Sequence, residues 1–141
     1  MSATTAITPH AGGHAGLGPL DSRPVEVGDL PWTPTRYPGI DMKILMEDPA
    51  SGLLTALFRW QPGSRLPLHE HVDIEQTYVL EGSFADDAGE LTAGNYVWRP
   101  AGSRHEAWSR DGALMLSMFL RPNRFLDDSG DRRPGAGGGD T

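Results

Sequence analysis

Short apolar runs, separated by residues that favour turns, fill the middle of this 141-residue chain. The clearest run spans residues 53–60, where one face of an extended strand carries Leu54, Ala56, Phe58 and Trp60. Side chains of a strand alternate between its two faces, so this pattern predicts a half-buried strand. We find no convincing helical periodicity, and we therefore predict an all-β sandwich or barrel of eight to ten short strands. The other predicted strands cover residues 25–30, 42–46, 66–71, 75–81 (ending at Gly82), 84–91 (a hairpin around Asp86-Asp87-Ala88-Gly89), 95–99, 105–109 and 113–121.

The two ends of the chain differ from the middle in composition. Residues 1–24 are rich in Ala, Gly, Thr and Pro, and residues 127–141 consist mainly of Asp, Arg, Gly and Pro. Segments with so little apolar surface to bury cannot offset the entropy of ordering. We expect a disordered N-terminal arm over 1–24, with His10 and His14 in solvent, a single domain over 25–126, and a disordered tail over 127–141.

The composition excludes several function classes. The formal net charge is -7, whereas a surface that binds nucleic acid needs basic residues. No apolar run is long enough to span a membrane, and the N-terminus lacks the basic and apolar regions of a secretory signal. We therefore expect a cytoplasmic protein with neither nucleic acid nor a membrane as partner. Because the chain has no cysteine, any metal must be held by His, Asp or Glu.

One stretch combines two histidines and a glutamate. His69 and His71 stand two residues apart, and Glu75 follows four residues after His71. In an extended strand the two histidines share a face, and Glu75 joins them if the strand resumes in phase after a turn. His105, on a predicted return strand, offers a third imidazole, and borderline divalent metals favour such a set of ligands. The residues alone leave two equal alternatives, a metal site or ordinary core and surface histidines.

The spacing of these residues resembles the first motif of the cupin family. That motif is Gly, five residues, His-x-His, three or four residues, Glu, six residues, Gly. The residues Gly63, His69, His71, Glu75 and Gly82 match it without departure.

A second stretch resembles the second cupin motif, which is Gly, five residues, Pro-x-Gly, two residues, His, three residues, Asn. Here Gly94, Pro100, Gly102 and His105 match, and Ser109 stands where the family has Asn. The combined resemblance extends over about residues 32–120. It implies a small cupin jelly-roll barrel with a divalent metal inside.

The resemblance also implies which residues bind the metal, namely His69, His71 and His105, with Glu75 as the fourth ligand. Residues 31–45 are most similar to small cupins related to acetylacetone-cleaving and dihydroxyacetophenone dioxygenases, and to the cupin domain of zinc-binding anti-sigma factors. In the acetylacetone-cleaving type three histidines hold iron and the glutamate is not a ligand. Glu75 is thus a candidate for either the fourth ligand or a catalytic carboxylate. The resemblance implies Fe(II), with Zn, Mn or Ni as alternatives, and a homodimer or homotetramer.

The implied activity is a non-haem iron dioxygenase that uses O2 to cleave a carbon–carbon bond of a small dicarbonyl or phenolic ketone. Three neutral histidines leave a divalent metal with a charge of about +2, and a Glu75 ligand lowers it to about +1. The higher charge favours an anionic, bidentate substrate such as an enolised diketone. Two alternatives stay open, namely a non-catalytic cupin that binds a metal or small ligand, and a metal-dependent isomerase or lyase without redox chemistry.

We expect the substrate pocket to be apolar and aromatic, because the inner face of a jelly roll must surround the metal. Each candidate could equally be a packing residue of the core. Arg59 either covers the sheet with its aliphatic stem or aims its guanidinium at an anionic ligand. The candidates are Phe58, Arg59, Trp60, Tyr96, Trp98, Trp108, Met115 and Phe119.

Overall fold

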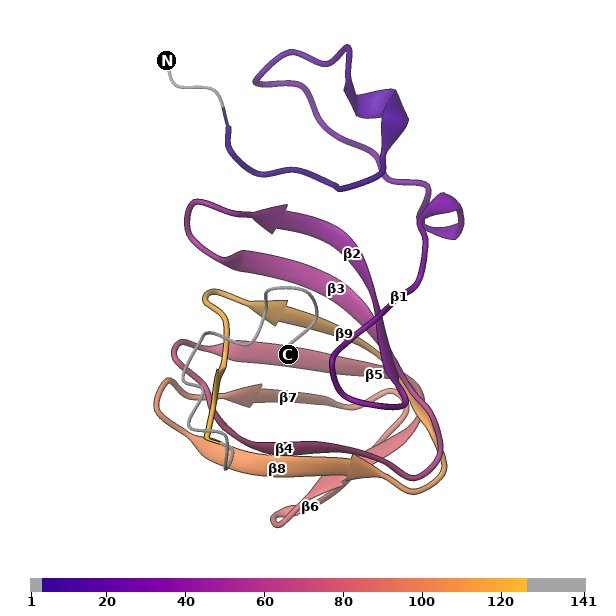
Figure 1. The fold of residues 1–141 in the computed structure, drawn as a ribbon, viewed down its shortest axis with the longest axis vertical. Coiled ribbons are helices and arrows are strands. Elements are labelled where there is room, and N and C mark those ends of the chain that lie inside the picture. The colour runs from indigo at the N-terminus through magenta and orange to yellow at the C-terminus, as the bar shows by residue number, and fades with distance from the viewer. Residues whose placement is uncertain (1–3, 127–141) are drawn as a thin grey trace.

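The computed structural model describes residues 4–126, and the elements named below lie in that range. It confirms the all-β prediction, because ten strands and two short 3-10 helices make up its regular structure (Figure 1). No helix within residues 4–126 is long and apolar enough to cross a membrane. In chain order the elements are η1 (Gly12–His14), η2 (Val27–Asp29), β1 (Thr33–Pro34), β2 (Ile40–Asp48), β3 (Leu53–Trp60), β4 (Ser64–Glu70), β5 (Glu75–Asp86), β6 (Gly89–Thr92), β7 (Tyr96–Arg99), β8 (Arg104–Ser109), β9 (Ala113–Phe119) and β10 (Arg124–Phe125).

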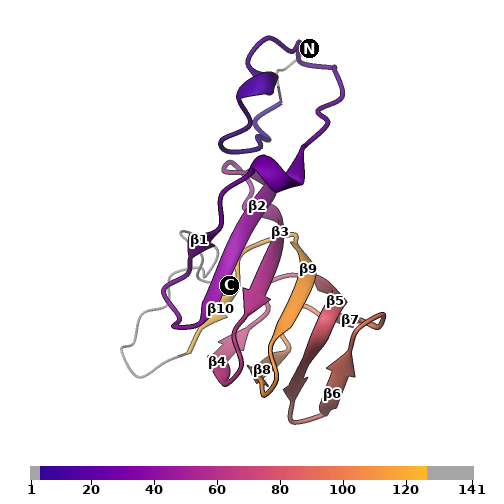
Figure 2. The ribbon, with the colours of Figure 1, turned by 90° about the vertical axis from the view of Figure 1, so that its right-hand side faces the viewer.

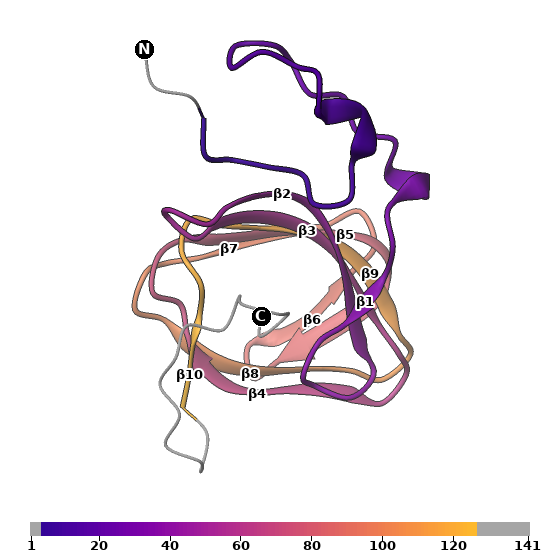
Figure 3. The same ribbon diagram turned by 45° about the horizontal axis from the view of Figure 1, so that its top comes forward.

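The strands form one curled antiparallel sheet. Their order is β1-β2-β3-β9-β5-β8-β4-β10, and β6 and β7 pair with β5 off this path. The first part of the long strand β5 pairs with β7 and β9, and its end pairs with β6 and β8. Because one strand serves both sets of partners, the sheet closes on itself. Figure 3 looks into the resulting barrel, where β4 and β8 face β2, β3 and β7 across the interior.

Gly82 is the point at which β5 passes from one set of partners to the other. Its φ is +71°, and a Cβ added there would lie 2.0 Å from the carbonyl oxygen of Gly112. The prediction that the strand ends at Gly82 was wrong. The strand continues to Asp86, because Gly82 pairs with Ala113 and the N–H of Ser83 donates to the Gly112 oxygen at 3.1 Å.

The alternation predicted for residues 53–60 is confirmed. Leu54, Ala56, Phe58 and Trp60 are buried, and the residues between them are only partly buried. Strand β9 alternates in the same phase, so that Met115 lies directly opposite Phe58. Burying one such large apolar side chain contributes roughly 1.5–3 kcal/mol. The buried apolar side chains of β3, β5 and β9 belong to one hydrophobic cluster inside the barrel, next to its polar site.

The strand predicted over residues 25–30 was wrong, because this segment forms the 3-10 helix η2. The N–H of Leu30 donates to the carbonyl oxygen of Val27 at 3.1 Å, which closes the turn. Pro31, which has no N–H to donate to a ladder, follows at once. The carbonyl oxygen of Val27 also accepts a hydrogen bond from Lys43 Nζ on β2, at 2.9 Å. The turn therefore covers the outer side of that strand.

Part of the expected arm, around Ile7 and Thr8, contacts the edge of β2. The backbone N–H and C=O of Ile7 pair with those of Glu47 at 2.7 and 2.8 Å. The hydroxyl of Thr8 donates to the Leu45 oxygen at 2.7 Å. Strand β1 pairs with β2 at only two residues, so the rest of that edge offers free backbone groups to a passing segment.

The domain boundaries at 24/25 and 126/127 stay predictions. His14, expected in solvent, places Nε2 2.7 Å from the carbonyl oxygen of Pro24. The predicted tail over 127–141 lies outside the described residues.

The geometry of β5 predicts that Gly82→Ala destabilises the fold strongly, by roughly 3–5 kcal/mol in the free energy of unfolding. The added Cβ meets backbone on β9's entry turn, and backbone cannot move aside as a flexible side chain can. Gly63→Ala is the matched control, because Gly63 also has a positive φ (+83°) but nothing within 4 Å of an added Cβ. It should lose only the backbone term of about 1–2 kcal/mol. Urea unfolding measures both, and equal losses would contradict the close approach at Gly82.

Candidate metal centre

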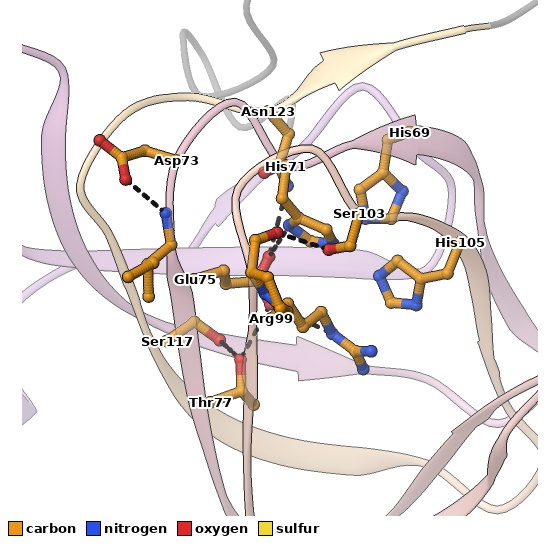
Figure 4. Close-up of polar contacts among 12 residues, drawn as sticks. His69, His71, Asp73, Glu75, Thr77, Arg99, Ser103, His105, Ser117 and Asn123 are labelled. Carbon is orange, nitrogen blue, oxygen red and sulfur yellow. Dashed lines mark hydrogen bonds and ion pairs between the residues drawn. The ribbon is translucent and has the colours of Figure 1, made fainter.

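Three histidines meet inside the barrel, two from paired strands and one from the loop that follows β4 (Figure 4). His69 on β4 lies directly opposite His105 on β8. The loop is fixed at His71, whose N–H donates to the Ser103 oxygen at 2.8 Å and whose oxygen accepts the N–H of Gly102 at 2.6 Å. One ring nitrogen from each histidine lies within 4.8 Å of the other two. His69 and His71 are buried, and His105 is partly buried.

A proline in β4 explains why His69 takes its position. Pro67 has no N–H for the ladder, and the pairing of β4 with β8 shifts register between Leu66 and His69. The carbonyl oxygen of Pro67 then accepts a hydrogen bond from His69 Nδ1 at 2.8 Å. The irregularity thus orients the imidazole as well as the backbone.

Two of the histidines have the tautomer that a metal ligand needs. The Nδ1 of His69 faces the Pro67 carbonyl, and the Nδ1 of His105 lies 3.2 Å from Asp86 Oδ2. Both partners only accept hydrogen bonds, so Nδ1 carries the proton in each ring and Nε2 keeps a free lone pair. Hydrogen bonds of this kind fix the orientation of ligating histidines in metalloproteins.

The third histidine, His71, is fully buried, and neither of its ring nitrogens makes a hydrogen bond within the described residues. Its Nδ1 lies 3.1 Å from Glu75 Oε1, but the two groups are not aligned for a hydrogen bond. A buried polar atom without a partner is costly. A divalent cation shared with the other two imidazoles would satisfy such an atom, so the residues present fit a metal.

The surroundings keep two of the imidazoles, those of His69 and His105, in the neutral form that binds metals. Burial, helped by the neighbouring His105, lowers the pKa of His69 from its ordinary 6.5 to about 3. Burial, helped by the charge of Arg99, lowers the pKa of His105 to about 4. At neutral pH neither ring must lose a proton before it can bind a cation.

Glu75 lies beside His71 at the edge of the histidine cluster. Its Oε2 accepts the hydroxyl of Thr77 at 3.1 Å, and its Oε1 lies 3.4 Å from the side-chain amide of Asn123. Burial tends to raise the pKa of this carboxyl, but His71, His69 and Arg99 outweigh it and lower the pKa to about 2. Glu75 is therefore an ionised acceptor held in a buried network. Its role as a ligand stays a prediction.

The cluster borders a small cavity of about 30 Å³, with an apolar wall opposite the polar groups. Four of the predicted pocket residues line it, namely Phe58, Trp60, Met115 and Phe119. The other lining residues are Leu66, His69, Glu75, Thr77, Phe84, His105, Ala107, Ser117 and Asn123.

Four predicted pocket residues lie outside this cavity, because their strands present them to the outer face. Arg59 alternates with Phe58 and Trp60, and its guanidinium stacks 4.2 Å from the ring centroid of Trp32 while lying 3.9 Å from Asp41. Arg59 was predicted either to cover the sheet or to bind an anionic ligand. In the structure it packs on the outside of the sheet. The remaining three are Tyr96 and Trp98, which are 45% and 56% exposed on β7, and Trp108, which is partly buried and stacks under Arg65 on the outside of β8.

The structure adds polar residues that the sequence interpretation did not assign to the site. Thr77 and Ser117 are both buried, and their hydroxyls are 2.8 Å apart across β5 and β9. Because side chains alternate along a strand, Thr77 shares the inner face with Glu75, and the sequence could have indicated it as a site residue. Asp86 was interpreted as a turn residue and Arg99 as a strand end, and no pattern marks Asn123, which follows β9.

Comparison with known proteins gives a family match and several structural neighbours. The sequence profile described as the ChrR cupin-like domain matches residues 21–123. No protein with a curated description matches the chain.

Among solved structures, a candidate acetylacetone dioxygenase from Methylibium petroleiphilum PM1 superimposes with a TM-score of 0.72 at 23% identity, over 83% of this chain and 89% of that chain. An acetylacetone dioxygenase from Acinetobacter johnsonii superimposes with a TM-score of 0.66 at 21% identity, over 79% of this chain and 81% of that chain. A chain of the complex between Rhodobacter sphaeroides SigE and the anti-sigma ChrR superimposes with a TM-score of 0.55 at 25% identity, over 66% of this chain and 50% of that chain. These likenesses confirm the cupin fold.

Replacing His69 or His105 by Ala is expected to abolish stoichiometric metal binding, because either change removes one of three converging imidazoles. The measurement is the metal-to-protein ratio by elemental analysis after loading with Fe(II) or Zn(II) and gel filtration. His14→Ala, which alters a histidine outside the cluster, should bind as much metal as the unmodified protein. Full stoichiometry in the His69 or His105 variant would refute the assignment.

The buried histidines also predict how the stability of the metal-free protein depends on pH. Because the folded-state pKa values of His69 and His105 lie below 6.5, the unfolded chain takes up protons first as the pH falls. Their contribution is complete above pH 6.5 and is lost toward pH 4, with a slope of up to about 1.4 kcal/mol per pH unit for each histidine. Glu75, with its lowered pKa, loses its contribution as the pH falls from 4.5 toward 2.

Urea unfolding of the chelator-treated protein at pH 7, 5.5 and 4.5 measures this slope. His69→Leu should reduce the dependence of the unfolding free energy on pH by about the contribution of one histidine. Unfolding free energies that stay constant over this range would contradict the neutral, buried state of the rings.

Proposed function

This chain belongs to the family of ChrR cupin-like domains, and we propose that it is a metal-dependent dioxygenase that cleaves a carbon–carbon bond of a small dicarbonyl or phenolic ketone. The observation that carries the proposal is the convergence of three imidazoles, two of them buried and one partly buried, beside an apolar cavity. His69, His71 and His105 are the proposed ligands. Fe(II) held there would supply Lewis acidity and open coordination positions for substrate and O2.

The residues around the cluster favour an anionic substrate that binds through two oxygens. Three neutral imidazoles do not compensate the charge of a divalent cation, so an enolised dicarbonyl is the substrate class that we propose. The wall of the cavity that includes Phe58, Met115 and Phe119 is apolar, which suits the alkyl or aryl substituents of a ketone.

Glu75 has a different proposed role from that of a general base. A carboxyl with a pKa of about 2 is a weak proton acceptor at neutral pH. We propose that its ionised oxygens orient His71 and remain outside the ligand set. The finding that agrees with this is that Glu75 accepts the hydroxyl of Thr77 and lies beside Asn123.

A second candidate function is metal binding without catalysis. Two observations favour it, namely the likeness to a chain of the SigE–ChrR complex and the size of the cavity. About 30 Å³ accommodates only one or two water molecules. The native metal separates the candidates, because iron favours oxygen chemistry and zinc favours a binding role.

The experiment that tests the proposal begins with elemental analysis of untagged protein purified without added metal. Oxygen consumption is then recorded with a panel of β-diketones and phenolic ketones after anaerobic loading with Fe(II). We expect uptake that depends on both iron and an enolisable ketone and that is absent in His105→Ala. Stoichiometric iron without uptake on any ketone of the panel would contradict the dioxygenase and leave the binding role.

We also propose that the chain forms a homodimer or homotetramer through the outer face of β5 and β7. Figure 2 shows the strands β2, β3, β9 and β5 side by side, with β7 beyond them. Tyr78, Leu80, Tyr96 and Trp98 are 42–56% exposed on these two strands. Exposed aromatic and aliphatic residues that cluster without charges are typical of contact surfaces.

Replacing Trp98 with Lys should therefore shift the protein to smaller species in light scattering coupled to gel filtration. The control is Leu20→Lys, which alters an equally apolar, 75% exposed residue of the arm. A monomeric unmodified protein at 100 µM, a concentration of the order at which weak dimers form, would contradict the proposal.

A further inference from the structure

The guanidinium of Arg99 is largely buried between two carboxylates. Its Nη1 lies 2.8 Å from Asp86 Oδ2, and its Nε lies 3.9 Å from Glu75 Oε2. The side chain is only 13% exposed, and the guanidinium lies 5.8 Å from the ring centroid of Phe84. The bond to Asp86 is a charge-assisted hydrogen bond, whereas the contact to Glu75 is an ion pair without a hydrogen bond, because Nε has no hydrogen-bond partner.

Each of these carboxylates contacts a different histidine of the cluster. Asp86 Oδ2 accepts from His105 Nδ1 at 3.2 Å. Glu75 Oε1 lies 3.1 Å from His71 Nδ1. The guanidinium of Arg99 is therefore linked through one carboxylate to each of two proposed ligands. Asp86 links it to His105, and Glu75 links it to His71. Figure 4 shows Arg99 next to Glu75, with its guanidinium directed toward the side of His105.

The fold explains how these residues come together. The register of β5 with β7 places Arg99 directly opposite Glu75. Asp86 lies at the far end of the same strand β5, and it reaches Arg99 only because β5 bends and carries the hairpin to β6 over that side of the barrel. The other oxygen of Asp86 is fixed by the N–H of Ala88 in the hairpin turn, at 2.8 Å. Asp86 is thus held from both sides before it meets His105.

We propose that Arg99 is a positioning residue that holds Asp86 against His105 and Glu75 beside His71, and so sets the tautomer and direction of His105 as a metal ligand. The inference rests on the metal site of the proposed function. It adds a residue at an unspecified position of the second motif, directly before Pro100 and next to Trp98, which is 56% exposed.

The charges at the site explain why an arginine serves here. Two carboxylates next to three neutral imidazoles repel each other, and one guanidinium reduces their combined charge from -2 to -1. A planar fork contacts two acceptors at different atoms, whereas the ammonium group of Lys is a single point of charge on a flexible stem. The remaining charge of -1 still attracts a divalent cation to the cluster.

The ionisation of the neighbouring groups agrees with this role. Burial tends to raise the pKa of Asp86, but the hydrogen bonds from the Ala88 N–H and from Arg99 lower it below its ordinary value. Asp86 therefore accepts from His105 as a carboxylate, which is the form that holds an imidazole with its proton on Nδ1.

The test reads the tautomers in the metal-free protein first and metal affinity second. Nitrogen-15 NMR of the histidine rings is recorded at pH 7.5 for the unmodified protein, Arg99→Met, Arg99→Lys and Arg104→Met. Arg104 is the matched control, because it lies next to His105 on β8 but pairs with Glu70 at the surface. Each protein is then titrated with Co(II), whose absorption spectrum reports the geometry of its ligands.

We expect His105 in the unmodified protein to carry its proton on Nδ1 alone. In Arg99→Met this single state should give way to a mixture of tautomers, and Co(II) should bind about 10- to 100-fold more weakly with an altered spectrum. Arg99→Lys should fall between these two proteins, and it carries the test if Arg99→Met does not fold. Arg104→Met should match the unmodified protein in both readouts.

Unchanged tautomers and unchanged Co(II) affinity in Arg99→Met would overturn the inference. An Arg99→Lys variant indistinguishable from the unmodified protein would do the same, because the fork would then be unnecessary. If the tautomers change as expected but the unmodified protein also fails to bind Co(II), the positioning role stands and the proposed metal-dependent function fails.

Discussion

Three imidazole rings share the interior of this barrel, with centroid separations of 4.5–4.9 Å. At such distances, away from water, burial and the charges of neighbouring groups lower the pKa values of His69 and His105. His69 and His105 are therefore held as neutral bases, and neither ring nitrogen of the buried His71 makes a hydrogen bond within the described residues. This arrangement is unfavourable for folding alone, and a shared cation would relieve it. The cross-strand pair of β4 and β8 and the loop at His71 maintain the arrangement, so the metal-binding chemistry depends on that one constraint.

The long strand β5 connects the site to the rest of the fold. It supplies Glu75 and Thr77 to the inner face, bends at Gly82, and ends at Asp86, which contacts His105. The same strand pairs with β7, which brings Arg99 into the network. Fold and site are thus coupled through a single element that belongs to both halves of the barrel. A change in its curvature would alter the environment of two histidines at once.

The sequence predicted the parts of this architecture that depend on local rules. Alternation predicted the buried face of β3, and motif spacing predicted the three histidines that converge. The orientation of β7 could not be predicted, because a four-residue strand with Tyr96 and Trp98 in one phase and Val97 and Arg99 in the other fits either face. The orientation of β7 is set by its pairing with β5, which places Arg99 opposite Glu75 and turns its side chain inward. Asp86 and Asn123 were missed for a similar reason, since they reach the site only through the curl of the sheet and the return of the chain along β4.

We infer that three imidazoles, without a carboxylate, hold a divalent metal in this barrel. X-ray absorption at the iron edge of the anaerobic Fe(II)-loaded protein tests it most directly, because outer-shell scattering counts imidazole rings separately from single oxygen ligands. We expect three imidazoles around the iron, and a spectrum that Glu75→Gln leaves unchanged. Two or fewer imidazoles, or the loss of an oxygen ligand in Glu75→Gln, would contradict it.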